Sequence, residues 1–227
     1  MDLFDRTSFH LLPLRSFILQ RSQDKIRREA ASRGITRLYH FTPTANGRSI
    51  LCNGLMSRNT LVAQGSSFHV TDELRIDDNL DGISVSIHSI NESMFRAKQR
   101  DFSDDWLIFE LKASILWTHT CRYCWRNASS SENRKHKGFR GGHWAFEKMF
   151  EDRPVSSVDN RSYRGVCEIP NFKPTDNSAE VQIFDPIASD IIVDVTVRTQ
   201  RIEDELDMLM REIDHVKPIV VNDGVFR

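Results

Sequence analysis

Residues 38–55 read LYHFTPTANGRSILCNGL, and this stretch decides the fold. Residues 37–41 predict a short strand that meets a Thr-Pro-Thr turn, and residues 45–52 predict a short helix closed by Asn53 and Gly54. Side chains two residues apart on a strand share a face, so His40 and Thr42 should point into one cleft beside the helix. An imidazole and a hydroxyl can both bond to a sugar. A lone histidine in an apolar strand is more often structural, but the surrounding pattern favours a binding site.

Residues 177–183, NSAEVQI, form the second informative passage. They predict a strand with a carboxylate, Glu180, at its start. An isolated glutamate on a strand usually faces solvent. Because Glu180 follows the His40 strand in the chain, we interpret it as a second residue of the site.

The two passages together resemble the DarT family of toxin ADP-ribosyltransferases. Weaker similarities are DGISVSI at 81–87, WLIFEL at 106–111, NAS at 127–129 and a helix at 144–152, so the resemblance spans roughly residues 36–195. It implies an α+β ADP-ribosyltransferase fold with two packed, mainly antiparallel sheets, flanking helices and an NAD cleft. The implied activity is transfer of ADP-ribose from NAD, the co-substrate, to a base of single-stranded DNA by a toxin of a toxin-antitoxin or phage-defence system.

The resemblance also implies roles for individual residues. Glu180 would be catalytic and would stabilise positive charge at the reacting ribose, while Arg75 would assist removal of the acceptor's proton. The cofactor-binding residues would be His40, Thr42, Asn46 and Arg58. Arg58 also competes for the role of Arg75, and Arg48 and Arg58 are alternatives for holding the NAD diphosphate.

Residues 122–148 combine seven Lys/Arg and two Glu with five aromatic residues, Tyr123, Trp125, Phe139, Trp144 and Phe146. Cations follow phosphates and aromatic faces stack on bases, so this region suits single-stranded nucleic acid, although the tryptophans could equally be core. The expected nucleic-acid-binding residues are Trp125, Arg126, Asn127 and Arg140. Residues 84–87 are less rich in aromatic and proline residues than the family leads us to expect, which leaves the base, and DNA against RNA, open. A catalytically silent nucleic-acid-binding module is the alternative from another class.

Cys121 and Cys124 form a CxxC, with His119, His136, His143 and Cys167 as further possible zinc ligands. No second CxxC or regular histidine pair completes a set of four. Ordinary buried thiols are therefore the better interpretation, and we expect no metal.

The chain of 227 residues has a formal net charge of -1 and is 39% hydrophobic, as expected of a globular protein. Residues 1–60 hold ten Lys/Arg against four Asp/Glu, whereas residues 190–227 hold five against nine. The acidic start does not read as a signal peptide and no apolar run suits a membrane span, so we expect a cytoplasmic protein without membrane association. The resemblance adds a macrodomain-type antitoxin as partner.

The expected organisation is a helical extension over residues 1–35, a transferase domain over 36–198, and an amphipathic helix with a tail over 199–227 packed on that domain. This last helix, at 199–216, could alternatively dock a partner. A basic helix should start at a Ser22 cap and end at Gly34. Further helices are expected at 90–99 and 144–151, a loop at 127–142, and strands at 82–87, 106–111, 165–169, 179–184 and 191–197.

Overall fold

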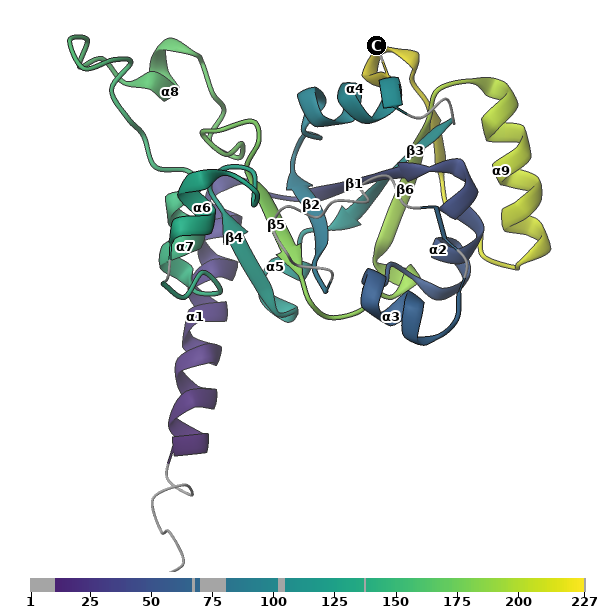
Figure 1. Ribbon diagram of the computed structural model, residues 1–227, viewed down its shortest axis with the longest axis horizontal. Helices are drawn as coiled ribbons and strands as arrows, with labels where there is room; N and C mark the ends of the chain where they lie inside the picture. The colour runs from purple at the N-terminus through teal and green to yellow at the C-terminus, as the bar shows by residue number, and fades with distance from the viewer. Residues whose placement is uncertain (1–10, 67, 70–80, 102–104, 137, 227) are drawn as a thin grey trace, which may run out of the picture.

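The computed structural model describes residues 11–66, 68–69, 81–101, 105–136 and 138–226 (Figure 1). Its seven strands are β1 (Arg37–Pro43), β2 (Ile83–Ile87), β3 (Trp106–Lys112), β4 (Cys121–Cys124), β5 (Glu180–Ile183), β6 (Ile192–Val197) and β7 (Ile219–Val221). The helices are α1 (Leu11–Arg33), α2 (Gly47–Asn53), α3 (Arg58–Ala63), α4 (Glu92–Asp101), α5 (Ile115–Thr118), α6 (Ser131–Lys135), α7 (His143–Lys148), α8 (Tyr163–Val166) and α9 (Gln200–Glu212). Single 3-10 turns lie at Thr44–Asn46, Ser189–Ile191 and Asp223–Phe226.

The strands follow the order β4-β5-β2-β1-β3-β6-β7, and every neighbouring pair is antiparallel except β6 and β7. This confirms the expected α+β class with a mainly antiparallel arrangement. The strands make one continuous order where two packed sheets were expected. The shortest ladder in the sheet joins β1 and β2, which pair only through Leu38–Ile87 and Tyr39–Ser86.

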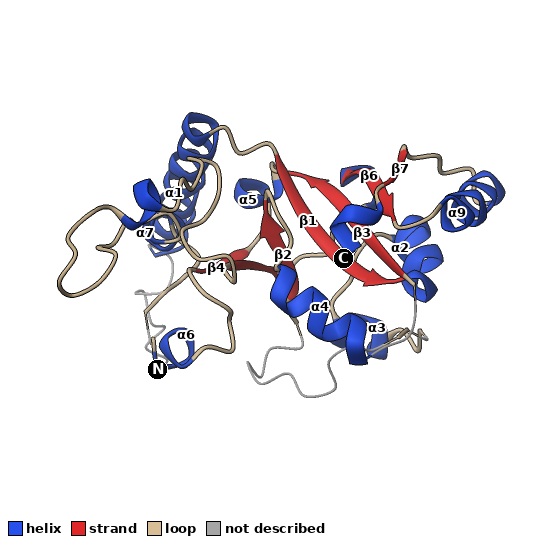
Figure 2. Ribbon diagram, turned by 90° about the horizontal axis from the view of Figure 1, so that it is seen from above, coloured by secondary structure: helices blue, strands red, loops and turns tan. Residues whose placement is uncertain are grey.

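Helices cover both faces of the sheet (Figure 2). The larger core joins one face to α1 and α5, through Ile26 and Ala30 of the first helix and Ile115 and Leu116 of the second. On the other face a smaller cluster packs Phe95 of α4 against β3 and Phe226. Burial of these apolar side chains is the main force that holds the helices to the sheet.

The basic helix is longer than its sequence signals indicate, because α1 begins at Leu11 and not at Ser22. Pro13 lies in the first helical turn, where a missing backbone N–H costs nothing. The Ser22 hydroxyl instead accepts a bond of 3.0 Å from the backbone N–H of His143 and so caps α7. Gly34 ends α1 as expected, with φ of 74°.

Two other local predictions are wrong. The strand expected at 165–169 is the short helix α8, because the Ser162 side chain caps it by accepting from the backbone N–H of Gly165. The loop expected at 127–142 contains the short helix α6, capped in the same way by Ser130. The amphipathic C-terminal helix is found as α9, which buries Ile202, Leu206 and Met210. No helix of the described residues has the length and apolar character needed to cross a bilayer.

Candidate active site

A pocket of about 150 Å³ lies where β1 ends and α2 begins. All four expected cofactor-binding residues line it, although they come from β1, the following turn and α3: His40, Thr42, Asn46 and Arg58. Further wall residues come from β2 and from the turn after α2, among them Ser84, Gly54 and Ser57. The structure therefore brings together residues that the sequence placed in one cleft.

Asn46 holds this pocket in shape through its side-chain amide. Its Nδ2 donates to Thr42 Oγ1 at 2.9 Å and to the His69 carbonyl at 3.1 Å, while its Oδ1 accepts from the His69 backbone N–H at 2.8 Å. Thr42 is only 7% exposed. The amide thus ties the strand end to the short segment 68–69 that closes one side of the pocket.

The ring of His40 is oriented by the neighbouring strand. Its Nδ1 lies 2.9 Å from the carbonyl oxygen of Ser84 on β2. A carbonyl oxygen can only accept, so Nδ1 carries the proton, and Nε2 of the neutral ring is an acceptor. Ser84 thus fixes the orientation of the His40 ring and the position of the proton on Nδ1.

Glu180 is the first residue of β5 and pairs with Cys124 of β4. Its Oε1 accepts a bond of 3.2 Å from the backbone N–H of Ala128. That loop is anchored in turn by the buried Asn133, whose Nδ2 donates to the carbonyls of Arg126 and Asn127. A carboxylate that accepts from a backbone N–H keeps one position while it faces a substrate.

The two sequence passages meet through β2. Ser84 bonds to His40 on one side and pairs with Gln182, two residues after Glu180, on the other. Glu180 itself is not among the residues that line the His40 pocket. The arrangement is a pocket and a carboxylate on strands separated by one intervening strand, which suits a substrate longer than the pocket.

The arginines separate into different environments. Arg58 lines the pocket at the start of α3. Arg48 turns away to Glu212 of α9, with two bonds of 2.9 and 3.0 Å, so it is engaged in an ion pair between helices. Arg75 lies outside the described residues.

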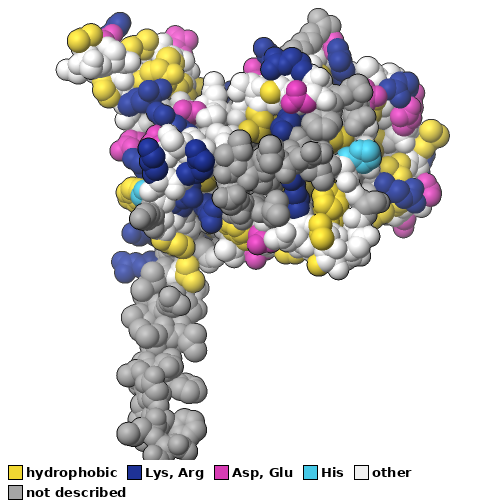
Figure 3. All heavy atoms as spheres, in the orientation of Figure 1, with side chains coloured by type: hydrophobic (Ala, Val, Ile, Leu, Met, Phe, Trp, Pro, Cys, Tyr) yellow, Lys and Arg dark blue, Asp and Glu magenta, His cyan; other side chains and the backbone are white. Residues whose placement is uncertain are grey.

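The basic segment 122–148 presents its cations over β4, α6 and α7 (Figure 3). Arg126 is exposed and lies 3.3 Å from Glu132 and 3.6 Å from Asp176. Arg140 donates to the sulfur of Cys124 at 3.4 Å. Both residues thus lie close to β4, the strand that pairs with the Glu180 strand.

The aromatic residues of this segment divide into core and surface. Tyr123, Trp125 and Phe146 are buried, whereas Phe139 is 73% and Trp144 54% exposed. Trp125 donates its Nε1–H to Glu132 at 2.7 Å and packs in the main core, so it supports the loop. It is 7% exposed and lies beside Arg126 in a small surface pocket, and its direct contact with nucleic acid stays a prediction.

The cysteine pair does not form a chelating site. Residues three apart on a strand point to opposite faces, and β4 holds both cysteines. Burial raises the pKa of the Cys121 thiol to about 12, as expected of a thiol inside the core.

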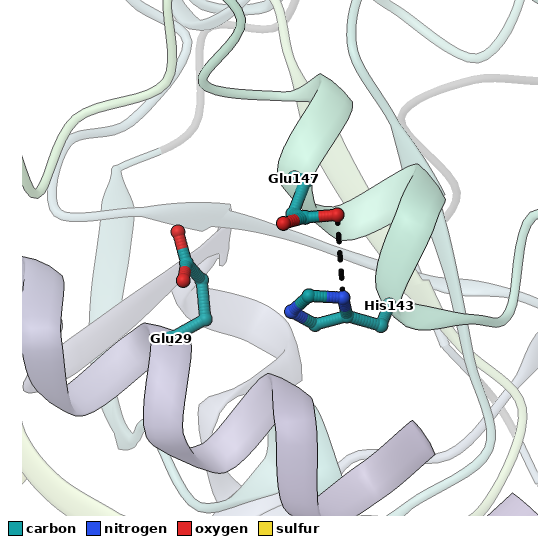
Figure 4. Close-up of side chains that lie close together, drawn as sticks. All are labelled: Glu29, His143 and Glu147. Carbon is teal, nitrogen blue, oxygen red and sulfur yellow. Dashed lines mark ion pairs between the residues drawn. The ribbon is translucent and has the colours of Figure 1, made fainter.

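Three other potential ligands approach one another between α1 and α7: Glu29, His143 and Glu147, whose ligand atoms lie within 4.8 Å of one another (Figure 4). Arg33 already donates to the Glu29 carboxylate at 2.7 Å, and His143 lies 3.3 Å from Glu147. These contacts account for the group as side-chain contacts within α1 and within α7.

Several site residues have no clear signal in the sequence. His69 contributes its backbone to Asn46, and Gly82 and Ser84 contribute the β2 wall of the pocket. Asn133 is completely buried and holds the loop behind Glu180. Only Ser57 is recognisable as a helix cap, since a serine before a helix is typical of an N-terminus.

The fold is similar to solved DarT structures at low sequence identity. The structure titled Thermus sp. 2.9 DarT in complex with ADP-ribosylated ssDNA matches with a TM-score of 0.57 at 13% identity, covering 86% of this chain and 97% of that one. The same DarT in complex with NAD+ gives 0.56 at 12% identity, covering 85% and 98%.

Thermosipho africanus DarTG in complex with ADP-ribose gives 0.55 at 14% identity over 84% of this chain, which spans 50% of that chain's length. No curated protein matches the chain in sequence.

The family model for the ssDNA thymidine ADP-ribosyltransferase DarT matches residues 39–227, from the histidine strand through the glutamate strand to the end of the chain. The matched segment contains both the pocket at the end of β1 and the Glu180 carboxylate on β5. The chain belongs to the DarT family of ssDNA thymidine ADP-ribosyltransferases.

Proposed function

We propose that this protein transfers ADP-ribose from NAD to a base of single-stranded DNA, with thymidine as the first base to test. The observation that carries the proposal is the placement of the His40 pocket and Glu180 on strands joined through Ser84 of β2, within the segment matched by the family. The relatives in complex with NAD+ and with ADP-ribosylated ssDNA support the same co-substrate and acceptor.

NAD would enter by its adenosine half. The His40 ring would bond to a ribose hydroxyl, Thr42 and Asn46 would shape the wall beside it, and the Arg58 guanidinium would attract the diphosphate. The pocket of about 150 Å³ is smaller than a typical cofactor site of roughly 300–1,000 Å³. The nicotinamide half therefore extends out of it toward Glu180.

Glu180 would act at the reacting ribose. The bond between nicotinamide and ribose breaks, its electron pair leaves with nicotinamide, and positive charge develops on the anomeric carbon. A fixed carboxylate stabilises that charge and can hold the ribose 2'-hydroxyl. A ring nitrogen of the base then bonds to the same carbon and loses its proton, the step for which we propose Arg75.

The acceptor strand would cross the loops around β4. Arg126 and Arg140 offer cations to the phosphates, and Asn127 stands beside Ala128, whose N–H bonds to Glu180. We further propose that residues 36–198 carry the transferase machinery, with residues 1–35 and 199–227 as packed additions. In the cell we propose a cytoplasmic toxin controlled by a macrodomain-type antitoxin, in line with its structural similarity to DarTG.

The acceptor class is tested by incubating the protein with labelled NAD and, separately, single-stranded DNA, RNA and protein. We expect label on thymidine-containing DNA and its loss in Glu180→Ala. Label on RNA alone or on protein alone would contradict the proposed DNA acceptor but would support the proposed transferase activity. Absence of both transfer and NAD binding would favour a nucleic-acid-binding module without catalysis.

A further inference from the structure

A groove lies between α1 and the segment that leads into α7, outside the pocket at the end of β1. Helices α1 and α7 lie side by side in Figures 1 and 2. Its walls include Arg21 and Lys25 of α1 on one side and Phe139 and Trp144 on the other, with His143 and Glu147 between them. Helix α1 precedes the segment matched by the family model, so half of this groove is outside that match.

The aromatic wall is exposed and held in place. Phe139 is 73% exposed, yet its ring rests on the glycine backbone after it, since a Cβ on Gly141 would come within 2.7 Å of the ring. Trp144 is 54% exposed, and its ring stacks on His136 with centroids 5.6 Å apart and planes 20° apart. Fixed, exposed rings are the platforms on which unpaired bases stack.

The opposite wall is cationic. Arg21 and Lys25 lie one helical turn apart and are both exposed. Among the described residues no ion pair involves either of them. Lys148, whose ammonium group lies 5.7 Å from the Trp144 ring centroid, is outside the lining and is paired with Glu151 at 2.8 Å. The acid in the groove, Glu147, lies 3.3 Å from His143. Excess positive charge beside open rings is the chemistry that binds a single-stranded polyanion.

The groove is connected to the catalytic strand through packed side chains. The Trp144 ring centroid is 5.9 Å from that of the buried Trp125. Trp125 directly follows Cys124, the strand partner of Glu180. The exposed Trp144 ring therefore lies close to the end of β4 that pairs with Glu180.

We propose that this groove, which we call the α1 groove, binds the single-stranded DNA that flanks the target base. The inference rests on the proposed function for the identity of the strand. Phe139 and Trp144 stack on bases, while Arg21 and Lys25 contact phosphates. The α1 groove thus extends the acceptor site away from the chemistry and favours long strands over short ones.

The aromatic half is tested by fluorescence anisotropy with a long and a short thymidine-containing oligonucleotide. Phe139→Ala and Trp144→Ala should each weaken binding of the long strand by roughly 5- to 100-fold per lost stack. Binding of the short strand should stay unchanged. Met208→Ala, which removes an exposed apolar side chain from α9, is the control.

The cationic half is tested by the salt dependence of binding. Replacing Arg21 and Lys25 together by Gln should reduce the slope of log K against log salt by about 1.4, because each phosphate contact to a single strand contributes about 0.7. Arg27→Gln removes one charge from the same helix outside the groove lining, and it should leave the slope unchanged.

Transfer kinetics separate this inference from the proposed function. The groove variants should raise KM for the long oligonucleotide and leave kcat and the short substrate unchanged. Suppose that the wild type transfers ADP-ribose and that the groove variants bind the long strand as tightly as the controls do. That result would overturn the α1 groove and would still support the proposed function. Absence of transfer by the wild type, with long-strand binding still lost in the variants, would overturn the function and keep the groove.

Discussion

Gly54 shows how one residue can determine the geometry of the candidate site. Its φ of 80° lies in the left-handed region, and a Cβ there would come within 2.1 Å of the Ile187 carbonyl oxygen. The next residue, Leu55, exchanges two backbone bonds with Ile187, of 2.8 and 2.9 Å. The glycine therefore lets the turn after α2 join the segment that leads to β6.

We expect Gly54→Ala to destabilise the protein by about 2–5 kcal/mol, from backbone strain and overpacking together. Gly65→Ala is the matched control, because Gly65 also has a positive φ, of 64°, but a Cβ there meets no atom within 4 Å. Urea unfolding of both variants measures the difference. Equal losses of stability in the two would show that the contact with Ile187 is unimportant.

His88 makes stability depend on pH. Burial is the main cause that lowers the pKa of His88, and its Nε2 accepts from the backbone N–H of Thr36 at 3.1 Å. The unfolded chain then binds a proton more readily than the folded chain. The stabilising contribution is complete above the unfolded pKa of about 6.5 and is lost as the pH falls through the folded value.

We therefore expect wild-type stability to decline below about pH 6.5 more steeply than that of His88→Gln. Thermal unfolding across a pH series measures the two slopes. The left-handed backbone at His88, with φ of 59°, is shared by both proteins, so the comparison of slopes is unaffected by its strain. Parallel curves would rule out His88 as the source of the pH dependence.

At the scale of elements, apolar patterns predicted the central strands β1, β2, β3, β5 and β6 and the helices α2, α4, α7 and α9. Local patterns failed where contacts with a distant part of the chain decide the structure. The four residues Cys121–Cys124 include the charged Arg122, and the sequence predicts buried thiols there but no strand. They form a strand through pairing with β5. Likewise α8 depends on Asp152, which accepts from the Ser162 hydroxyl and the Arg164 backbone N–H.

Two serine caps support different halves of the site. Ser57 caps α3, which carries Arg58, and Ser130 caps α6 in the acceptor loop. Replacing either cap by Ala should cost about 1 kcal/mol, or roughly 2–4 °C in Tm. Ser57→Ala should raise KM for NAD, whereas Ser130→Ala should raise KM for the DNA acceptor. Steady-state kinetics with each substrate varied in turn would contradict this division if both variants changed the same KM.

At the scale of the whole molecule, the sequence predicted which residues line the pocket better than it predicted how distant segments come together. His40, Thr42, Asn46 and Arg58 all line one pocket because they lie within nineteen residues of one another, so local geometry places them together. The position of Glu180 beside Cys124 and the parallel pairing of β7 with β6 depend on contacts between distant segments. Such contacts cost loop entropy and leave no periodic pattern in a single sequence.

The most direct test of the central claim is the mass of a thymidine-containing single-stranded oligonucleotide after incubation with NAD and the protein. We expect the wild type to add one ADP-ribose and Glu180→Gln, which keeps the shape but removes the charge, to be slower by at least about 10²-fold. Glu110→Gln, at another strand glutamate that bonds to Arg37 and Tyr39, should retain transfer. Wild-type rates in Glu180→Gln, or an unmodified oligonucleotide with the wild type, would contradict the account.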